Sequence, residues 1–193
     1  MPKTNLKFNI SNILSSNDSI VGDKIAGNQF SYKFNADSTG HLLKSITVYS
    51  EGSKIQEIIA NKATYDKKYG LIDWNFDGYK DITVLYNSGS GGCAYWIWNY
   101  SQNDGKFYYN DRLSEKLGLE IDPASKYIIF HYRAGWPEER WDTLKYLNNK
   151  LKFVKGLYQE RWIDSDGNSW VKNTSREFIN DEIIQSVDSL IIK

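Results

Sequence analysis

Residues 72–111 read IDWNFDGYKDITVLYNSGSGGCAYWIWNYSQNDGKFYYND, and this stretch decides the fold that we expect. A polar loop runs directly into the apolar run 81–87, and a Gly-rich bend leads into the Tyr- and Trp-rich run 94–100. A turn at Asp104-Gly105 then precedes a third aromatic run. Aromatic and β-branched residues favour strands, and Asp-Gly favours a hairpin turn. The stretch therefore predicts consecutive antiparallel hairpins.

Short runs of the same kind continue on both sides of this stretch. Several of them alternate apolar and polar residues at a period of two, as half-buried strands do. The runs are NQFSYKFN (28–35), LLKSITVYS (42–50), KIQEIIA (54–60), KYIIFHYR (126–133), TLKYLN (143–148), KLKFVKG (150–156) and YQERWID (158–164). We therefore expect one mainly β domain over 1–193, built of antiparallel hairpins in a propeller-like or meander sheet.

Two stretches favour helix. Residues 111–122 read DRLSEKLGLEID and place leucines near helical spacing, but Gly118 limits such a helix to about two turns. The tail, 175–193, is compatible with a helix that has one apolar face and equally with further strand. The expected fold is thus mainly β with one or two short helices.

The composition limits the classes of function. The chain of 193 residues has 24 basic and 24 acidic residues, so it lacks the basic surface of a nucleic-acid-binding protein. No run approaches the ~20 apolar residues that span a bilayer as a helix, and MPKTNLKFNI has no apolar core of a signal peptide. Two locations stay open: the cytoplasm, or export as a mature protein cloned without its leader.

The sequence offers no arrangement of residues typical of an enzyme. Cys93 is the single cysteine, and the two histidines, His41 and His131, lie far apart in sequence, so a zinc site or a Ser-His-Asp triad is not expected. The carboxylates of WPEERWD (136–142) stand beside tryptophans, but neighbouring acids and arginine are typical of a solvated loop. We therefore expect no enzymatic activity.

The loop DWNFDGYKD (73–81) is a candidate metal site. Oxygen-bearing side chains stand at positions 1, 3, 5 and 9, and glycine at position 6 permits the sharp turn of a calcium loop. Ligands that are all oxygen favour Ca²⁺ over zinc or copper. The predicted ligands are the side chains of Asp73, Asn75, Asp77 and Asp81 and the carbonyl of Tyr79.

This loop differs from that of a calcium sensor. Position 12 is Val84 instead of a bidentate Glu, and both flanks read as strands, so we expect a structural ion and not a switch. An Asx-rich turn without metal is the alternative. A second, weaker candidate is Asp164-Ser165-Asp166-Gly167, for which a β-turn is the better interpretation and a second ion stays open.

Residues 72–111, followed by LEIDPASKYIIFHYRAG (119–135) and WDTLKYLNNKLKFV (141–154), resemble in order a family of small periplasmic β-rich proteins. The family has propeller-like sheets and a calcium loop, and it includes immunity proteins against lysozyme-like effectors of type IV secretion systems. The resemblance covers roughly 70–156. It implies a periplasmic protein, supported by calcium, that binds a toxin and blocks its active site. Only the five loop ligands carry over as site residues.

We therefore predict an immunity protein whose partner is a peptidoglycan-hydrolysing toxin. The loop after the run 126–133 is a candidate contact surface because Trp and Arg are enriched at interface hot spots; a scaffold corner with a buried Trp is the alternative. The candidate contact residues are Arg133, Trp136, Glu138, Glu139 and Arg140. The oligomeric state stays open.

A calcium-dependent carbohydrate- or cell-surface-binding module is the alternative function. Aromatic side chains can stack on sugars, although tryptophans in strands are more often part of a core. The candidate stacking residues are Trp96, Trp98, Trp136, Trp141 and Trp162.

Overall fold

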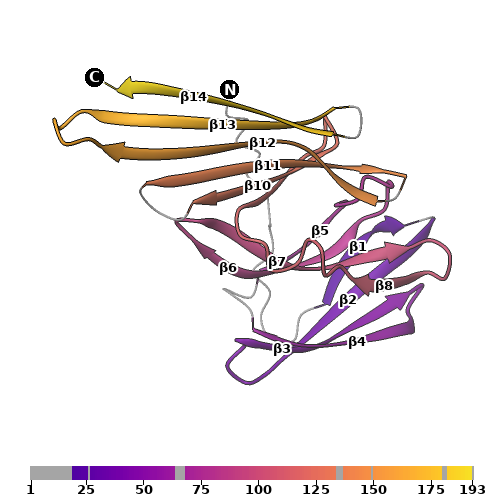
Figure 1. Cartoon of the computed structure of the whole chain (residues 1–193). Coiled ribbons are helices and arrows are strands. Elements are labelled where there is room, and N and C mark those ends of the chain that lie inside the picture. Colours follow the sequence, from indigo (N-terminus) through magenta and orange to yellow (C-terminus); the bar gives the residue numbers. More distant parts are fainter. Residues whose placement is uncertain are drawn as a thin grey trace. The chain divides into compact units, whose positions relative to one another are not determined.

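The computed structural model describes residues 19–25, 27–63, 68–133, 137–148, 150–179 and 182–192. Within these ranges the chain forms strands β1 to β14 and no helix. The strands make three antiparallel sheets, and strands that follow one another in the chain are neighbours in the sheet (Figure 1). The prediction of a mainly β fold made of consecutive hairpins is confirmed.

The described residues divide into two compact units. Unit 1 comprises the chain up to Ser88 together with Ala94–Glu115, and unit 2 comprises Gly89–Cys93 together with the chain from Lys116 onward. The expectation that 1–193 forms one domain stays a prediction.

The first sheet of unit 1 has the order β1-β2-β3-β4. Its strands are β1 (Ser19–Ile25), β2 (Asn28–Ala36), β3 (Leu42–Ser50) and β4 (Ser53–Ala63). Between β3 and β4 stand only Glu51 and Gly52, whose φ angles of 49° and 79° suit the tight turn that a two-residue hairpin requires. On β2 the buried residues are Phe30, Tyr32 and Phe34, so the period-two pattern marks the inner face.

The second sheet has the order β5-β6-β7-β8 and carries the predicted metal loop between its first two strands. Its strands are β5 (Tyr69–Ile72), β6 (Asp81–Gly89), β7 (Gly92–Ser101) and β8 (Lys106–Tyr109). Five consecutive residues are buried on β6, 81–85, and five on β7, 94–98, so both faces of these strands are covered. This explains why their sequences are continuously apolar and do not alternate.

Aromatic side chains join the two sheets of unit 1 into one core. Phe34 of β2 stacks on Tyr69 of β5 with 4.1 Å between ring centroids, and Phe30 meets Tyr100 of β7 edge to face at 5.7 Å. Gln56 of β4 donates to the carbonyl of Phe107 of β8 at 2.8 Å and accepts the amide of the same residue. The high aromatic content therefore fills a core.

The third sheet forms unit 2, in the order β14-β13-β12-β11-β10-β9. Its strands are β9 (Leu119–Asp122), β10 (Tyr127–Arg133), β11 (Glu138–Leu147), β12 (Lys150–Ile163), β13 (Ser169–Ile179) and β14 (Glu182–Ile192). The tail is therefore a β-hairpin, the second of the two structures that its sequence allowed. Figure 1 shows β14 as the outermost strand of this sheet.

The expected helix over 111–122 is wrong. Turns occupy this region up to Gly118, and Leu119–Asp122 forms β9, which pairs with β10. Glu115 and Gly118 both have a φ of 66°, outside the right-handed helical region. The leucines at helical spacing therefore lie in a turn and a strand instead of a helix.

Candidate functional site

The predicted metal loop is organised by hydrogen bonds from its own backbone. Asp73 accepts the amides of Asp77 at 3.2 Å and Gly78 at 2.9 Å. Asn75 Oδ1 accepts the Asp77 amide at 3.1 Å, and Asp77 Oδ1 accepts the Tyr79 amide at 2.8 Å. Gly78 has a φ of 90°, which explains the glycine at the sixth position. The side chains at positions 1, 3 and 5 are therefore drawn into one turn.

The donor set of this turn fits a hard cation. A carboxylate offers about four lone-pair sites, and the hydrogen bonds of Asp73 and of Asp77 each occupy two. Burial raises the pKa of Asp73, and the nearby negative charge of Asp77 raises it further. A positive ion would relieve this repulsion. The same hydrogen bonds also complete a metal-free Asx turn, so the geometry fits both interpretations.

Carboxylates alone do not build a metal site in the described part of the chain. No three His, Cys, Asp or Glu side chains gather there as a group that could hold an ion. A cation in the loop would therefore depend on the Asn75 side chain and on backbone oxygens such as that of Tyr79, as calcium loops do.

Asp81, the fifth predicted ligand, is placed differently. It begins β6, is fully buried, and accepts three hydrogen bonds: from the amides of Trp74 and Tyr100, both at 2.9 Å, and from Asn99 Nδ2 at 2.6 Å. Burial raises its pKa to about 7, against the effect of these donors. In this structure Asp81 links the loop to β7 through these hydrogen bonds.

A polar network continues from Asp81 through residues that sequence reasoning missed. Asn99 Oδ1 accepts a hydrogen bond from Asn110 Nδ2 at 2.5 Å, and Asn110 Oδ1 accepts the amides of Arg112 and Leu113, both at 3.1 Å. The signal was present, because Asn99 is the polar residue inside the aromatic run WIWNY. A partly buried polar residue in such a run needs partners, and the loop supplies one.

The predicted contact residues do not form one patch. Trp136 lies outside the described residues. Arg133 pairs with Glu139 across β10 and β11, and their side chains meet at 3.2 Å from Nε to Oε1. Glu139 is only 14% exposed in its side chain and also lies 4.0 Å from Arg161. Glu138 and Arg140 alternate with Glu139 along the strand and therefore face the other side of the sheet.

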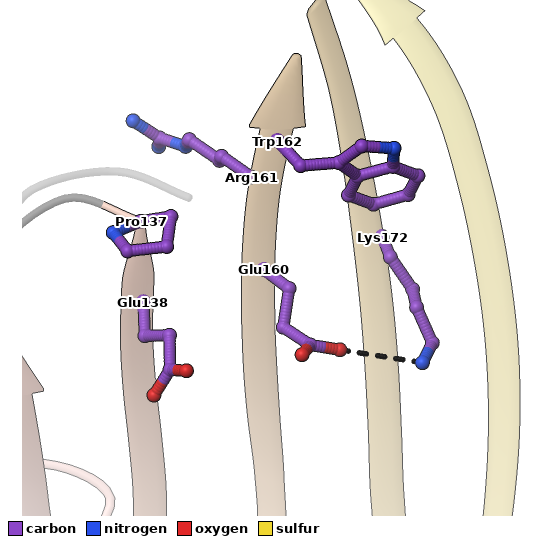
Figure 2. Close-up of a pocket in the computed structure, with 6 residues that line it drawn as sticks. All are labelled: Pro137, Glu138, Glu160, Arg161, Trp162 and Lys172. Carbon is purple, nitrogen blue, oxygen red and sulfur yellow. Dashed lines mark ion pairs between the residues drawn. The ribbon is translucent and has the colours of Figure 1, made fainter. Parts of the chain in front are cut away.

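A pocket of about 490 Å³ lies on the β11, β12 and β13 strands, next to Glu138 (Figure 2). Its lining residues are Pro137, Glu138, Glu160, Arg161, Trp162 and Lys172. Glu160 and Lys172 point toward one another and form an ion pair at 3.2 Å. Trp162 is 39% exposed and stacks on Trp170 with 6.0 Å between ring centroids. Such a surface can bind by stacking and by charge.

The other candidate tryptophans that the structure describes are structural. Trp96 and Trp98 belong to the buried core of unit 1, as strand tryptophans usually do. Trp141 stacks on His131 with 4.8 Å between ring centroids. Among the described candidates for sugar stacking, Trp162 alone is exposed.

The second candidate metal loop is a hairpin turn. Asp164 Oδ1 accepts the amides of Asp166 at 3.0 Å and Asn168 at 2.8 Å. Its Oδ2 accepts the indole N–H of Trp170 at 2.8 Å. These donors, of which the indole has the largest effect, lower the pKa of Asp164 to about 2. The β-turn interpretation therefore accounts for the aspartate and the glycine of this stretch.

Comparison with known proteins gives a likeness in fold. The chain matches no protein-family model and no curated protein. Its structure is similar to that of a Xanthomonas type IV secretion system related protein, with a TM-score of 0.59 and 18% sequence identity, over 88% of this chain and 93% of that one. At this identity the likeness shows a shared fold. The described residues include no helix with the length and hydrophobicity that a membrane crossing requires.

Proposed function

We propose that this chain is an immunity protein that binds and blocks a bacterial cell-wall-degrading toxin, a lysozyme-like effector of a secretion system. The observation that carries the proposal is the fold likeness, nearly end to end, to a Xanthomonas protein related to a type IV secretion system. The motif order of residues 72–154 resembles that of the family that includes immunity proteins against lysozyme-like effectors. A toxin that cleaves peptidoglycan acts outside the cytoplasmic membrane, so the proposal also places this chain in the periplasm.

We assign to the toxin the face of the third sheet that carries the pocket lined by Glu138, Glu160, Trp162 and Lys172, and we call it the pocket face. It combines an exposed tryptophan, Trp162, with charges of both signs from Glu138, Glu160 and Lys172. Tryptophan side chains are frequent anchors of protein interfaces, and charged neighbours add orientation. Of the contact residues expected from the sequence, Glu138 and Arg140 share this face.

The proposal predicts that a peptidoglycan hydrolase is encoded beside the gene for this chain, and the test uses that hydrolase. We expect the two proteins to co-purify and the hydrolase to lose activity on purified peptidoglycan when this chain is added. Trp162→Ala should weaken the complex by about 2 kcal/mol, a typical value for an interface anchor, in a calorimetric titration. Ile163→Ala is the matched control, since Ile163 is the adjacent exposed residue on the opposite face.

Two results would contradict the immunity proposal. The first is the absence of any complex with the neighbouring hydrolase. The second is a complex in which the hydrolase keeps its full activity. A complex that forms equally well with the Trp162→Ala and Ile163→Ala variants would instead remove the pocket face from the proposal.

We also assign a structural Ca²⁺ to the loop of unit 1. Asp73, Asn75, Asp77 and the carbonyl of Tyr79 would hold the ion, because their oxygens share one turn and keep free lone pairs. The ligand role of Asp81 stays a prediction, since its oxygens already accept three hydrogen bonds. When bound, the ion would neutralise the loop and stiffen the β5–β6 connection.

Thermal unfolding tests the calcium assignment without any toxin. Ca²⁺ should raise the melting temperature of the unaltered protein relative to a chelator, because an ion that binds the folded state stabilises it. Asp77→Ala should remove this difference, whereas Asp166→Ala, in the hairpin turn of unit 2, should keep it. An unaltered protein that melts at the same temperature with Ca²⁺ and with chelator would remove the ion from the proposal.

A carbohydrate- or surface-binding module is the second candidate function. The exposed Trp162 beside a polar pocket favours it, because an aromatic face with nearby charged groups suits a sugar ring. Retention on insoluble peptidoglycan, lost in Trp162→Ala, would support this function. A protein that is not retained on peptidoglycan but still inhibits the hydrolase would exclude the binding-module function and support the immunity proposal.

A further inference from the structure

β14 is an unusual edge strand. It is 11 residues long, and among the described residues it pairs with β13 alone, in an unbroken register from Glu182 to Ile192. The other outer strands differ: β5, β8 and β9 have 4 residues each, and the pairings of β1 and β4 contain register shifts. A long regular edge offers unpaired backbone donors and acceptors to another strand.

The side chains of β14 do not protect this edge. The strand EIIQSVDSLII contains no Lys or Pro, the residues that most often blunt an edge, and its charged residues are Glu182 and Asp188. Ile184, Val187 and Leu190 are 52%, 53% and 55% exposed, although apolar side chains gain by leaving water. By contrast, β4 carries Lys54 and Lys62. The β14 edge therefore has the properties of a strand that pairs with a partner.

The sequence of β14 identifies the partner. Residues 184–190 read IQSVDSL, which is a palindrome in polarity: apolar, polar, polar, apolar, polar, polar, apolar. An antiparallel strand of the same sequence, centred on Val187, places Val187 opposite Val187 and Ile184 opposite Leu190. It also places Gln185 opposite Ser189 and Ser186 opposite Asp188. Over 184–190 every residue then faces one of its own polarity, which stabilises cross-strand pairs, whereas at the ends of the strand Glu182 comes opposite Ile192.

Neighbouring registers lack this match. A pairing centred on Asp188 would set two carboxylates directly opposite one another, and like charges in that position destabilise a sheet. A pairing centred on Ser186 would set Asp188 against Ile184. In the Val187 register, the hydroxyl of Ser186 can donate to the Asp188 carboxylate of the other copy. Charge and polarity thus select a single register.

We propose that two copies of this chain associate through antiparallel β14–β14 pairing about a two-fold axis at Val187. The two six-stranded sheets then become one continuous sheet, and the interface is the same surface on both copies. At about 3.4 Å per residue, a strand of this length provides a seam of about 37 Å. The inference does not depend on the proposed function, because it concerns an edge and not the pocket face.

Oligomeric state and a charge exchange test the inference. The full chain should sediment as a dimer that dissociates on dilution. Val187→Lys and Val187→Glu should each be monomeric, because each sets two like charges opposite one another, and an equimolar mixture of the two should recover the dimer. Ile163→Lys is the matched control: Ile163 is 58% exposed but lies on the inner strand β12, so its variant should remain a dimer.

A cross-link tests the register in a Cys93→Ser background, which removes the natural cysteine. Val187→Cys should form a disulfide between two copies under copper–phenanthroline and air, because its opposed Cβ atoms lie about 5 Å apart. Ser189→Cys should not, since the two Ser189 positions would be separated by about 13 Å along the strands.

The inference is wrong if the unaltered chain is monomeric at every concentration, or if Val187→Lys leaves the dimer intact while circular dichroism shows a folded protein. It is also wrong if the Lys and Glu variants do not combine. Equal cross-linking at positions 187 and 189 would exclude the register centred on Val187.

Discussion

The two units of this protein use their apolar residues differently. In unit 1, the rings of β2, β5, β7 and β8 interlock in a buried core, and even the aspartate that begins β6 is fully buried. In unit 2, the side chains of β14 from Glu182 to Leu190 are all exposed. The apolar side chains of unit 1 therefore stabilise a buried core, whereas those of β14 are left exposed among the described residues.

Sheet arrangement is the physical reason for this difference. Unit 1 contains two four-stranded sheets whose aromatic rings meet, so each sheet has an apolar face to bury. Unit 2 contains one six-stranded sheet, and its outer hairpin, β13–β14, is held by backbone pairing. Substitutions in the two units should therefore have unequal effects, and three sets of measurements test the comparison.

The largest expected effect is in unit 1, for Asp81→Ala. The substitution removes the acceptor of two buried backbone amides, those of Trp74 and Tyr100, and of the partly buried Asn99 side chain. Leaving such groups unsatisfied should lower the free energy of unfolding by about 3–5 kcal/mol. Chemical denaturation measures this loss in the free energy of unfolding. Asp122→Ala is the counterpart in unit 2, where two amides near the surface lose their acceptor, and its loss should be clearly smaller. Equal losses would contradict the contrast between the units.

The next effect is in unit 2, for Gly118→Ala. A Cβ at Gly118 would lie 1.7 Å from the carbonyl oxygen of His131, so the backbone of β10 would have to move. We expect the free energy of unfolding to fall by about 3 kcal/mol.

Gly52→Ala in unit 1 is the control for Gly118→Ala. Gly52 also has a positive φ, 79°, but a Cβ there meets nothing within 4 Å. Its loss should be about 1 kcal/mol, the cost of the backbone conformation alone. If the two variants lose the same stability in denaturant titrations, the close approach of Gly118 to His131 does not contribute to the stability of unit 2.

The smallest effect is the pH dependence of the turn at Asp164. The indole N–H of Trp170 and the donors of Asn168 lower the pKa of Asp164 from its ordinary 3.8 to about 2. A carboxyl whose pKa is lower in the folded state stabilises the fold above pH 3.8, and this contribution is lost as the pH falls through 2. The folded protein should show this in the Trp170 indole N–H resonance, which should shift with a midpoint near 2.

Asp164→Asn provides the control for this titration. The variant keeps an acceptor for the indole but has no carboxyl to titrate, so the resonance of Trp170 should no longer follow pH in this range. A midpoint near the ordinary value in the unaltered protein would mean that the turn does not stabilise the ionised carboxylate.

The sequence by itself determined the loop and many of the strands, but not β1, β5 or β9. Aromatic and β-branched runs separated by Asp-Gly turns specify hairpins, because each hairpin depends on residues close in the chain. The loop from Asp73 to Tyr79 was equally predictable, since its hydrogen bonds join residues within five positions of one another. The failed helix at 111–122 shows the limit: leucine spacing was right, but backbone conformations at Glu115 and Gly118 do not continue a helix.

The tertiary structure decided everything that depends on distant residues. It turned Asp81 toward Asn99 and Tyr100 of β7, and it placed Glu138 and Glu139 on opposite faces of one sheet. It also made β14 an outer strand, so that the polarity palindrome around Val187 stands at an edge with which no other described strand pairs. Local pattern fixes which residues form a strand, but only the pairing of strands fixes what each strand faces, because that energy comes from residues far apart in the chain.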